Sequence, residues 1–281
     1  MGKMISINIF RSDGVLIAGL SAAALILTAA CSSGGGPAGA GGSAAPSLTP
    51  RHVLLAAATQ ARQMTSFTEM VTTQIGGVQG EMLTGTIVAK LKPTLQVAAN
   101  LRLAAAGQSS QVKEIITGTA LYLSTATLTR HLGKPWAKID LSALKGPRGA
   151  SLALLVRSMQ SDNVSYQAEM LTLAKNARVV GMQTVGGVPT TELAGSLKAA
   201  EALKMRPASF RKFLAPALRA LGNSTIRFHV WIDGQDRIRK MTSIATVGGQ
   251  TIHTTLTVTS LNQPVDITLP PASQTATLPG L

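Results

Sequence analysis

Alternation of apolar and polar residues is the dominant pattern in the chain after residue 49. Between residues 95 and 103, apolar side chains at every second position alternate with polar or small ones, which is typical of a strand with one buried face. Similar segments, bounded by Gly or Pro turns, recur along most of the chain. They predict about ten strands, at 66–75, 82–91, 95–103, 111–117, 120–124, 178–185, 188–197, 226–233, 237–246 and 251–260, with short additional segments at 136–140 and 264–269.

Helical periodicity interrupts this pattern. Thr49 can cap a helix that starts at Pro50 and continues to about residue 64. Further helices are predicted at 152–159, 164–175, 199–205 and 209–221, where apolar residues recur at three- and four-residue spacing. Most strands follow one another through short turns, so the predicted fold is α+β: a strongly curved antiparallel sheet, or half-barrel, with helices covering its concave face.

The first 48 residues have the organisation of an export signal followed by a tether. Residues 1–30 combine a basic start with a 14-residue apolar stretch, too short to span a bilayer as a helix. The segment ends in Leu27-Thr28-Ala29-Ala30-Cys31, which resembles the bacterial lipobox, although Thr28 stands where Leu is commoner. Residues 31–48, rich in Gly, Ser, Ala and Pro, predict a flexible tether. The folded domain is expected at 49–275, with a tail at 276–281.

Cys31 is therefore the predicted lipid-attachment site. Such a cysteine carries at least two acyl chains, enough for stable anchoring to the extracytoplasmic face of a cell membrane. The alternative is an ordinary secretory signal cleaved near Ala30, with Cys31 a free thiol. As the chain's single cysteine, it excludes an internal disulfide.

The net charge of +14 favours anionic partners, among which nucleic acid fits poorly because only 3% of the residues are aromatic. A solvated basic surface with no dedicated partner remains the alternative. We find no nucleophile elbow, phosphate-binding loop or paired carboxylates, and we predict no enzymatic activity, no cofactor and no metal site. His229, Trp231 and Asp233 should share one strand face, which we interpret as a solvated or edge-covered strand face rather than a site.

Several segments resemble a known family. These are GKPWAKID (133–140), VGGVPTTELAG (185–195), VWIDGQDRIRKM (230–241) and PVDITLPPAS (264–273). Together with the order of elements, they resemble the LppX/LprG-type lipoproteins of mycobacteria and other actinobacteria, which share the LolA-like half-barrel. The resemblance implies a hydrophobic cavity between sheet and helices that binds lipids or acylated glycolipids, and it implies no catalytic residues.

The function expected is a monomeric lipid carrier, with envelope transport proteins as possible partners. The alternative is an envelope sensor or scaffold that uses the same fold to bind a protein. Apolar residues on the third strand and on the covering helices are the candidate cavity lining: Leu95, Val97, Ala99, Leu101, Leu152, Leu155, Val156, Met159, Phe210, Phe213 and Leu214.

Overall fold

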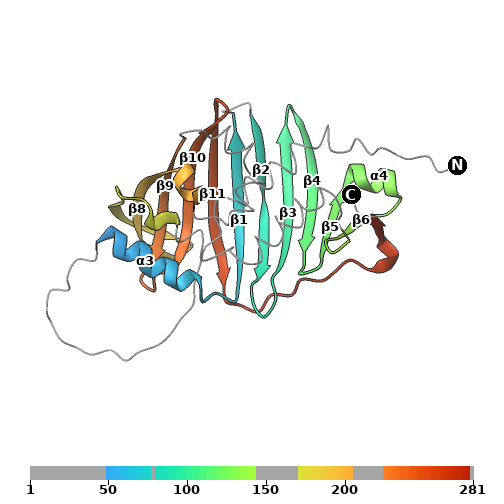
Figure 1. Ribbon diagram of the computed structural model, residues 1–281, viewed down its shortest axis with the longest axis horizontal. Coiled ribbons are helices and arrows are strands. Elements are labelled where there is room, and N and C mark those ends of the chain that lie inside the picture. Colours follow the sequence, from blue (N-terminus) through green and yellow to red (C-terminus); the bar gives the residue numbers. More distant parts are fainter. Residues whose placement is uncertain (1–48, 77–79, 144–169, 205–223, 279–281) are drawn as a thin grey trace.

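A computed structural model describes residues 49–76, 80–143, 170–204 and 224–278, whose strands form one twelve-stranded sheet (Figure 1). The strand order is β12-β6-β5-β4-β3-β2-β1-β11-β10-β9-β8-β7. The strands are β1 (Ser66–Ile75), β2 (Glu81–Lys90), β3 (Gln96–Ala105), β4 (Gln108–Ile116), β5 (Ala120–Thr125), β6 (Trp136–Asp140), β7 (Arg178–Val185), β8 (Val188–Lys198), β9 (Thr225–Asp233), β10 (Ile238–Val247), β11 (Gln250–Leu261) and β12 (Thr275–Leu278). All ten strands predicted with period-two patterns are confirmed, as is the short strand at 136–140.

The sheet consists of two antiparallel meanders joined at the middle. Strands β1 to β6 follow one another in the sheet, and so do β7 to β11. The junction is the antiparallel pairing of β1 with β11, from Phe67↔Leu261 to Ile75↔Ile252. The first strand of the domain is therefore central, and the outer edges are β12 and β7.

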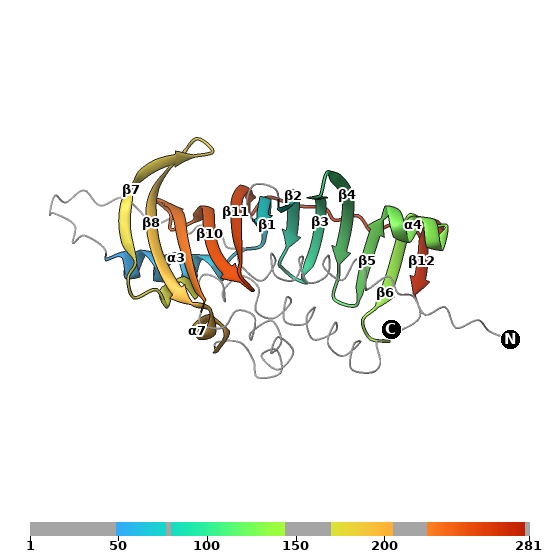
Figure 2. The same cartoon turned by 90° about the horizontal axis from the view of Figure 1, so that it is seen from above.

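The sheet is curved, as Figure 2 shows in the view from above. Helix α3 (Pro50–Ala61) begins as predicted: Pro50 occupies the first turn and the Thr49 hydroxyl accepts a hydrogen bond from the His52 amide. Helix α3 lies across the lower ends of β8 to β10 in Figure 1, and its buried residues, such as Leu54 and Ala57, belong to one apolar cluster with residues of β1, β9 and β10. Helix α7 (Ala199–Lys204) follows β8. The α+β fold expected from the sequence, with a strongly curved antiparallel sheet, is confirmed.

A shorter helix, α4 (Ala126–Leu132), was not predicted. Its N-terminus is capped by the Thr125 hydroxyl, which accepts from the Leu128 amide, and it ends at Gly133 in the left-handed conformation (φ 63°). The predicted helices at 152–159 and 209–221 lie outside the described residues. Of the helix predicted at 164–175, residues 170–175 are described: Met170 to Thr172 are helical, whereas residues 173–175 are not.

The segment after β11 crosses the convex face to the far edge of the sheet. The edge strand predicted at 264–269 is wrong: these residues form no strand, and Ile267 instead packs against Ile115 and Tyr122. The chain then enters β12, which pairs in parallel with β6 from Thr275↔Trp136 to Leu278↔Ile139. Strand β12 ends at Leu278, in the segment assigned to the tail from residue 276.

Candidate functional site

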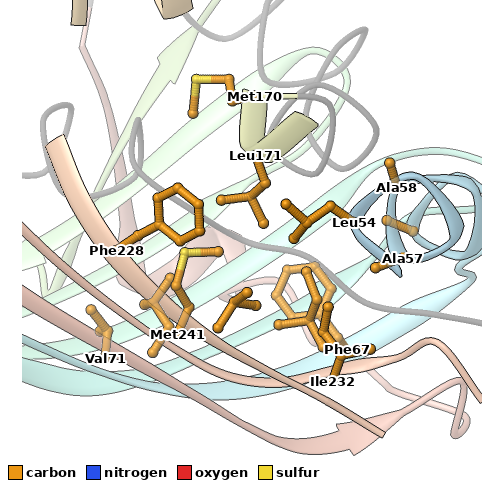
Figure 3. Close-up of a cluster of buried hydrophobic side chains, with 14 of the residues drawn as sticks. Leu54, Ala57, Ala58, Phe67, Val71, Met170, Leu171, Phe228, Ile232 and Met241 are labelled. Carbon is orange, nitrogen blue, oxygen red and sulfur yellow. The ribbon is translucent and has the colours of Figure 1, made fainter. Parts of the chain in front are cut away.

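One half of the concave face, made by β1 and β8 to β11, is a packed core. Figure 3 shows α3 and the start of the 170–174 segment facing these strands. Leu54 and Leu171 lie between Phe67, Phe228 and Met241, and all five are buried. Gly195 on β8 contributes by its small size, because a Cβ there would lie 2.7 Å from Cζ of Phe228. This half of the face is closed by the protein's own side chains.

The other half, made by β2 to β6, is lined by aliphatic and small side chains. Several of these remain partly exposed although they face the concave side: Ile87, Val97, Ala99, Leu103 and Leu123. Deeper residues of the same lining are Ala89, Leu101, Val112, Ile116, Leu121 and Ile139. An apolar concave surface with partly exposed side chains is a typical binding surface for an apolar ligand.

Of the candidate lining residues, three lie together on this surface. Val97 and Ala99 are partly buried on β3, and Leu101, on the same strand, is 2% exposed. Leu95 is buried just before β3, outside the apolar cluster that contains the other three. The remaining candidates lie outside the described residues: Leu152, Leu155, Val156, Met159, Phe210, Phe213 and Leu214.

Two acidic residues on the concave face were not identified from the sequence. Glu69 is on β1 between Phe67 and Val71, and Glu114 is on β4 between Val112 and Ile116. Glu69 is 1% exposed and its Oε1 has no hydrogen-bond partner within the described part of the chain. Each glutamate is an ionisable residue on a strand face whose other members are apolar. This interruption of the alternating pattern was the signal in the sequence that could have revealed it.

Burial changes the ionisation of both carboxyl groups. Desolvation raises the pKa of Glu69 well above its usual value. Desolvation likewise raises the pKa of Glu114, from 4.5 to about 7. The raised pKa favours the protonated form of each carboxyl group, and Glu114, with a pKa of about 7, titrates near neutral pH.

Stability should depend on pH through Glu114. A raised native pKa means that the native state binds the proton more tightly than the unfolded chain, so stability falls as pH rises from 4.5 towards 7. We expect Glu114→Gln to match the wild type at pH 4 and to exceed its unfolding free energy at pH 8, by an upper limit of about 3 kcal/mol. Urea unfolding at both pH values measures this. The exposed Glu201, changed to Gln, is the control; equal gains in both variants would contradict the assignment.

Three residues that the sequence places on one strand face lie on the convex side of the sheet. His229, Trp231 and Asp233 do share this face of β9. His229 Nδ1 lies 2.6 Å from Glu192 Oε1, while Lys240 Nζ lies 4.5 Å from the centre of the Trp231 ring. Asp233 binds Arg237 in the turn before β10 and Arg239 on β10. The surface is solvated only in part, because His229 is exposed whereas Trp231 and Asp233 are buried. The contacts account for the three residues as structural parts of this face.

In the ranges that the structure describes, no three His, Cys, Asp or Glu side chains are placed to hold a metal ion. No helix within those ranges has the length and apolar character needed to cross a membrane.

These features define the class of protein: an open antiparallel half-barrel with an apolar concave face. Among solved structures, the chain is similar to LprF from Mycobacterium bovis (11% identity, 79% of this chain and 96% of that chain covered, TM-score 0.49). It is also similar to LppX, a lipoprotein from Mycobacterium tuberculosis (18% identity, 77% and 98% covered, TM-score 0.42). A third similar structure is the MucA/MucB complex of Pseudomonas aeruginosa (16% identity, 75% and 57% covered, TM-score 0.35).

LprF and LppX are mycobacterial proteins, as are the lipoproteins that the sequence motifs resemble. No family model and no curated protein matches the sequence. With TM-scores below 0.5, the structural similarities give no basis for transferring a function. What the chain does is inferred from its own residues.

Proposed function

We propose that the protein is a membrane-anchored carrier of acyl lipids or glycolipids in a bacterial cell envelope. The observation that carries the proposal is the β2–β6 half of the concave face, where Ile87, Val97, Ala99, Leu103 and Leu123 are apolar and partly exposed. Removing apolar surface from water contributes about 25 cal/mol per Å². An acyl chain laid along these strands would be held by burial alone, without a catalytic group.

The proposed anchor is a lipid on Cys31, followed by the 31–48 tether. The sequence supports it through the apolar export signal and the small residues that precede Cys31. A flexible tether of this length has an r.m.s. reach of about 20 Å. The domain would stay near the membrane surface while its concave face exchanges lipid there. This places the protein on the extracytoplasmic face.

The direct test is lipid extraction from the purified, folded chain followed by mass spectrometry. We expect acyl lipids in stoichiometric amounts. Recovery of no lipid, together with no binding of added acylated lipids, would contradict the carrier function.

Filling the concave face should reduce lipid loading. Ala99 lies between its cross-strand partners Ile87 and Glu114, so Ala99→Trp places an indole where the chain of the ligand would lie. We expect about a tenfold loss of affinity for a fluorescent acyl probe, equivalent to about 1.4 kcal/mol. Fluorescence titration measures the change.

Asn100→Trp is the matched control, because Asn100 is the next residue on β3 and is exposed on the opposite face. It should bind the probe as the wild type does. Equal affinity of the Ala99→Trp variant and the wild type would place the ligand elsewhere. Circular dichroism confirms that both variants are folded.

A second function, binding a protein partner, is favoured by one observation. Strand β7 is an outer edge of the sheet, and its Val179, Val180 and Met182 are exposed by 51%, 49% and 79%. An exposed edge strand with apolar side chains can accept a strand from another protein. This envelope-scaffold function would become the leading one if lipid is absent from the purified chain.

A further inference from the structure

The convex face of the six middle strands of the sheet carries basic and neutral side chains but no acidic ones. These strands lie in the order β10-β11-β1-β2-β3-β4. Their core residues face the concave side, so the alternate positions face outward. At the outward positions of these six strands, which the structure describes in full, no Asp or Glu occurs, whereas Arg102, Lys113 and Lys240 do. The middle of the convex face is therefore positively charged.

The acidic residues on the outer strands do not neutralise this charge. On β8 and β9, Glu192 lies 2.6 Å from His229, and Asp233 is held between two arginines. Asp266 precedes Ile267, which packs on β4 and β5 at the other side of the convex face. The basic residues of the middle strands thus have no counter-charge on those strands.

One row of outward side chains crosses all six strands and has a lysine at each end. In strand order, the row consists of Lys240, Thr257, Met70, Thr86, Asn100 and Lys113. Neighbouring strands are about 4.8 Å apart, so the backbones that carry the two lysines are separated by about 24 Å. Arg102, in the next row, lies diagonally opposite Lys113 and adds a third positive charge.

Two exposed methionines occupy the middle of this surface. Met70 on β1 is 52% exposed and Met82 on β2 is 44% exposed. The row between them holds Thr72 and Thr84, which are uncharged. On the convex side of a curved sheet the middle strands project furthest, so the methionines stand at the crest and the basic residues on either side of it (Figure 2).

An anionic lipid bilayer complements both features. Lipid phosphates attract Lys and Arg, each of which contributes about a fivefold gain in binding close to an anionic lipid surface. Apolar side chains surrounded by basic ones enter the boundary between headgroups and acyl chains. An acidic protein would match the charge but would offer the methionines no apolar layer. The tether proposed at 31–48, with a reach of about 20 Å, would keep the domain near such a surface.

We propose that the convex face of the six middle strands docks on the surface of an anionic lipid bilayer. Met70 and Met82 enter the headgroup layer, and the three basic residues bind lipid phosphates. The inference goes beyond the carrier function and does not depend on it. Docking turns the concave face away from the bilayer, so lipid exchange with the anchoring membrane takes place in the undocked state.

The test is lysine footprinting of the purified full chain, reconstituted on vesicles. One set of vesicles is phosphatidylcholine and the other contains about 30% phosphatidylglycerol, and peptide mass spectrometry follows the acetylation of each lysine. On the anionic vesicles Lys113 should react at least about threefold more slowly than on phosphatidylcholine, and high salt should remove the difference. Lys175, exposed on the segment that packs on the concave face, should react equally on both.

Two charge reversals form a matched pair, because both arginines are exposed and both variants change the charge equally. In Arg102→Glu, the docking constant derived from the protection of Lys113 should fall at least about fivefold. In Arg178→Glu, at the start of the edge strand β7, it should stay unchanged. Met70→Ser/Met82→Ser removes the apolar crest and should lower the constant about threefold, because less apolar area enters the bilayer.

Equal acetylation of Lys113 on the two kinds of vesicle would overturn the inference, and so would equal slowing of Lys113 and Lys175. Soluble polyglutamate tests the other occupant. If it protects Lys113 as well as the anionic vesicles do, and the serine variant docks as the wild type does, the surface binds an acidic protein and the bilayer is excluded. These results leave the carrier function untouched, because lipid extraction tests it separately.

Discussion

Replacing Asp233 with alanine is expected to lower the unfolding free energy by about 3 kcal/mol. The Asp233 side chain is 1% exposed, and its Oδ2 lies 2.7 Å from Nε of both Arg237 and Arg239. Its Oδ1 accepts hydrogen bonds from the backbone amides of Gln235 and Arg237. The alanine variant would leave two guanidinium groups without their counter-charge and two turn amides without an acceptor. Urea unfolding at pH 7, followed by tryptophan fluorescence, measures the loss.

The pH dependence of this effect identifies its cause. Burial alone would raise the pKa of Asp233, but the hydrogen bonds from Arg237, Arg239 and Gln235 outweigh it and hold the pKa below the usual value. A lowered native pKa stabilises the fold above the unfolded-state value, and that contribution is lost as pH falls through the native pKa. The deficit of the alanine variant should therefore shrink in acid.

Asp233→Asn is the matched control because it keeps an oxygen for the turn amides but loses the charge, and it should be destabilised by less than the alanine variant. A deficit in the alanine variant that stays constant down to acidic pH would show that the turn is held by packing instead.

Replacing Cys31 with serine is expected to move nearly all of the protein from the membrane fraction to the soluble fraction. A buried CH₂ group contributes about 0.8 kcal/mol to membrane binding, so two acyl chains supply a large excess over thermal energy and their loss is close to all-or-none. Fractionation of cells that export the chain, followed by immunoblotting, measures the distribution.

Ser33→Ala, two residues along the tether, should remain in the membrane fraction. A Cys31→Ser variant that also remains there would contradict a lipid anchor at this position. Mass spectrometry of the wild type provides the independent check, since a lipidated cysteine adds the mass of its acyl chains.

Local patterns in the sequence predicted the strands well, because one face of each strand is buried and the other is solvated. Residues 95–103 illustrate this: Leu101 is buried, whereas Asn100 and Arg102 are exposed. The helix at Pro50 was predicted for a similarly local reason, the Thr49 cap. Such features depend on neighbours within a few residues.

Features that depend on distant partners could not be predicted. The parallel pairing of β12 with β6 and the packing of Ile267 on the convex face join segments more than 100 residues apart. Residues 264–269 were predicted as a strand from their local pattern, but they connect β11 to β12 across the convex face without forming a strand. α4 was missed because it is short and has no buried residue to give an apolar stripe.

In the candidate site, too, residues on one strand could be predicted to lie together, whereas residues on separate strands could not. Val97, Ala99 and Leu101 could be predicted to lie together because they alternate on one strand. Glu69 and Glu114 are 45 positions apart and were considered singly. Only the pairing of β1 with β2, β2 with β3, and β3 with β4 places them in one row.

The central position of β1 has a consequence for biosynthesis. Its partner β11 is almost at the other end of the domain, and Thr73 meets Thr254 across 181 positions of sequence. An exported chain would emerge with β1 lacking this neighbour until nearly the whole domain has crossed the membrane. Such distant pairing slows folding and leaves an unpaired edge open to aggregation in the meantime. In an exported chain, the two meanders could therefore join only after nearly the whole domain has crossed the membrane.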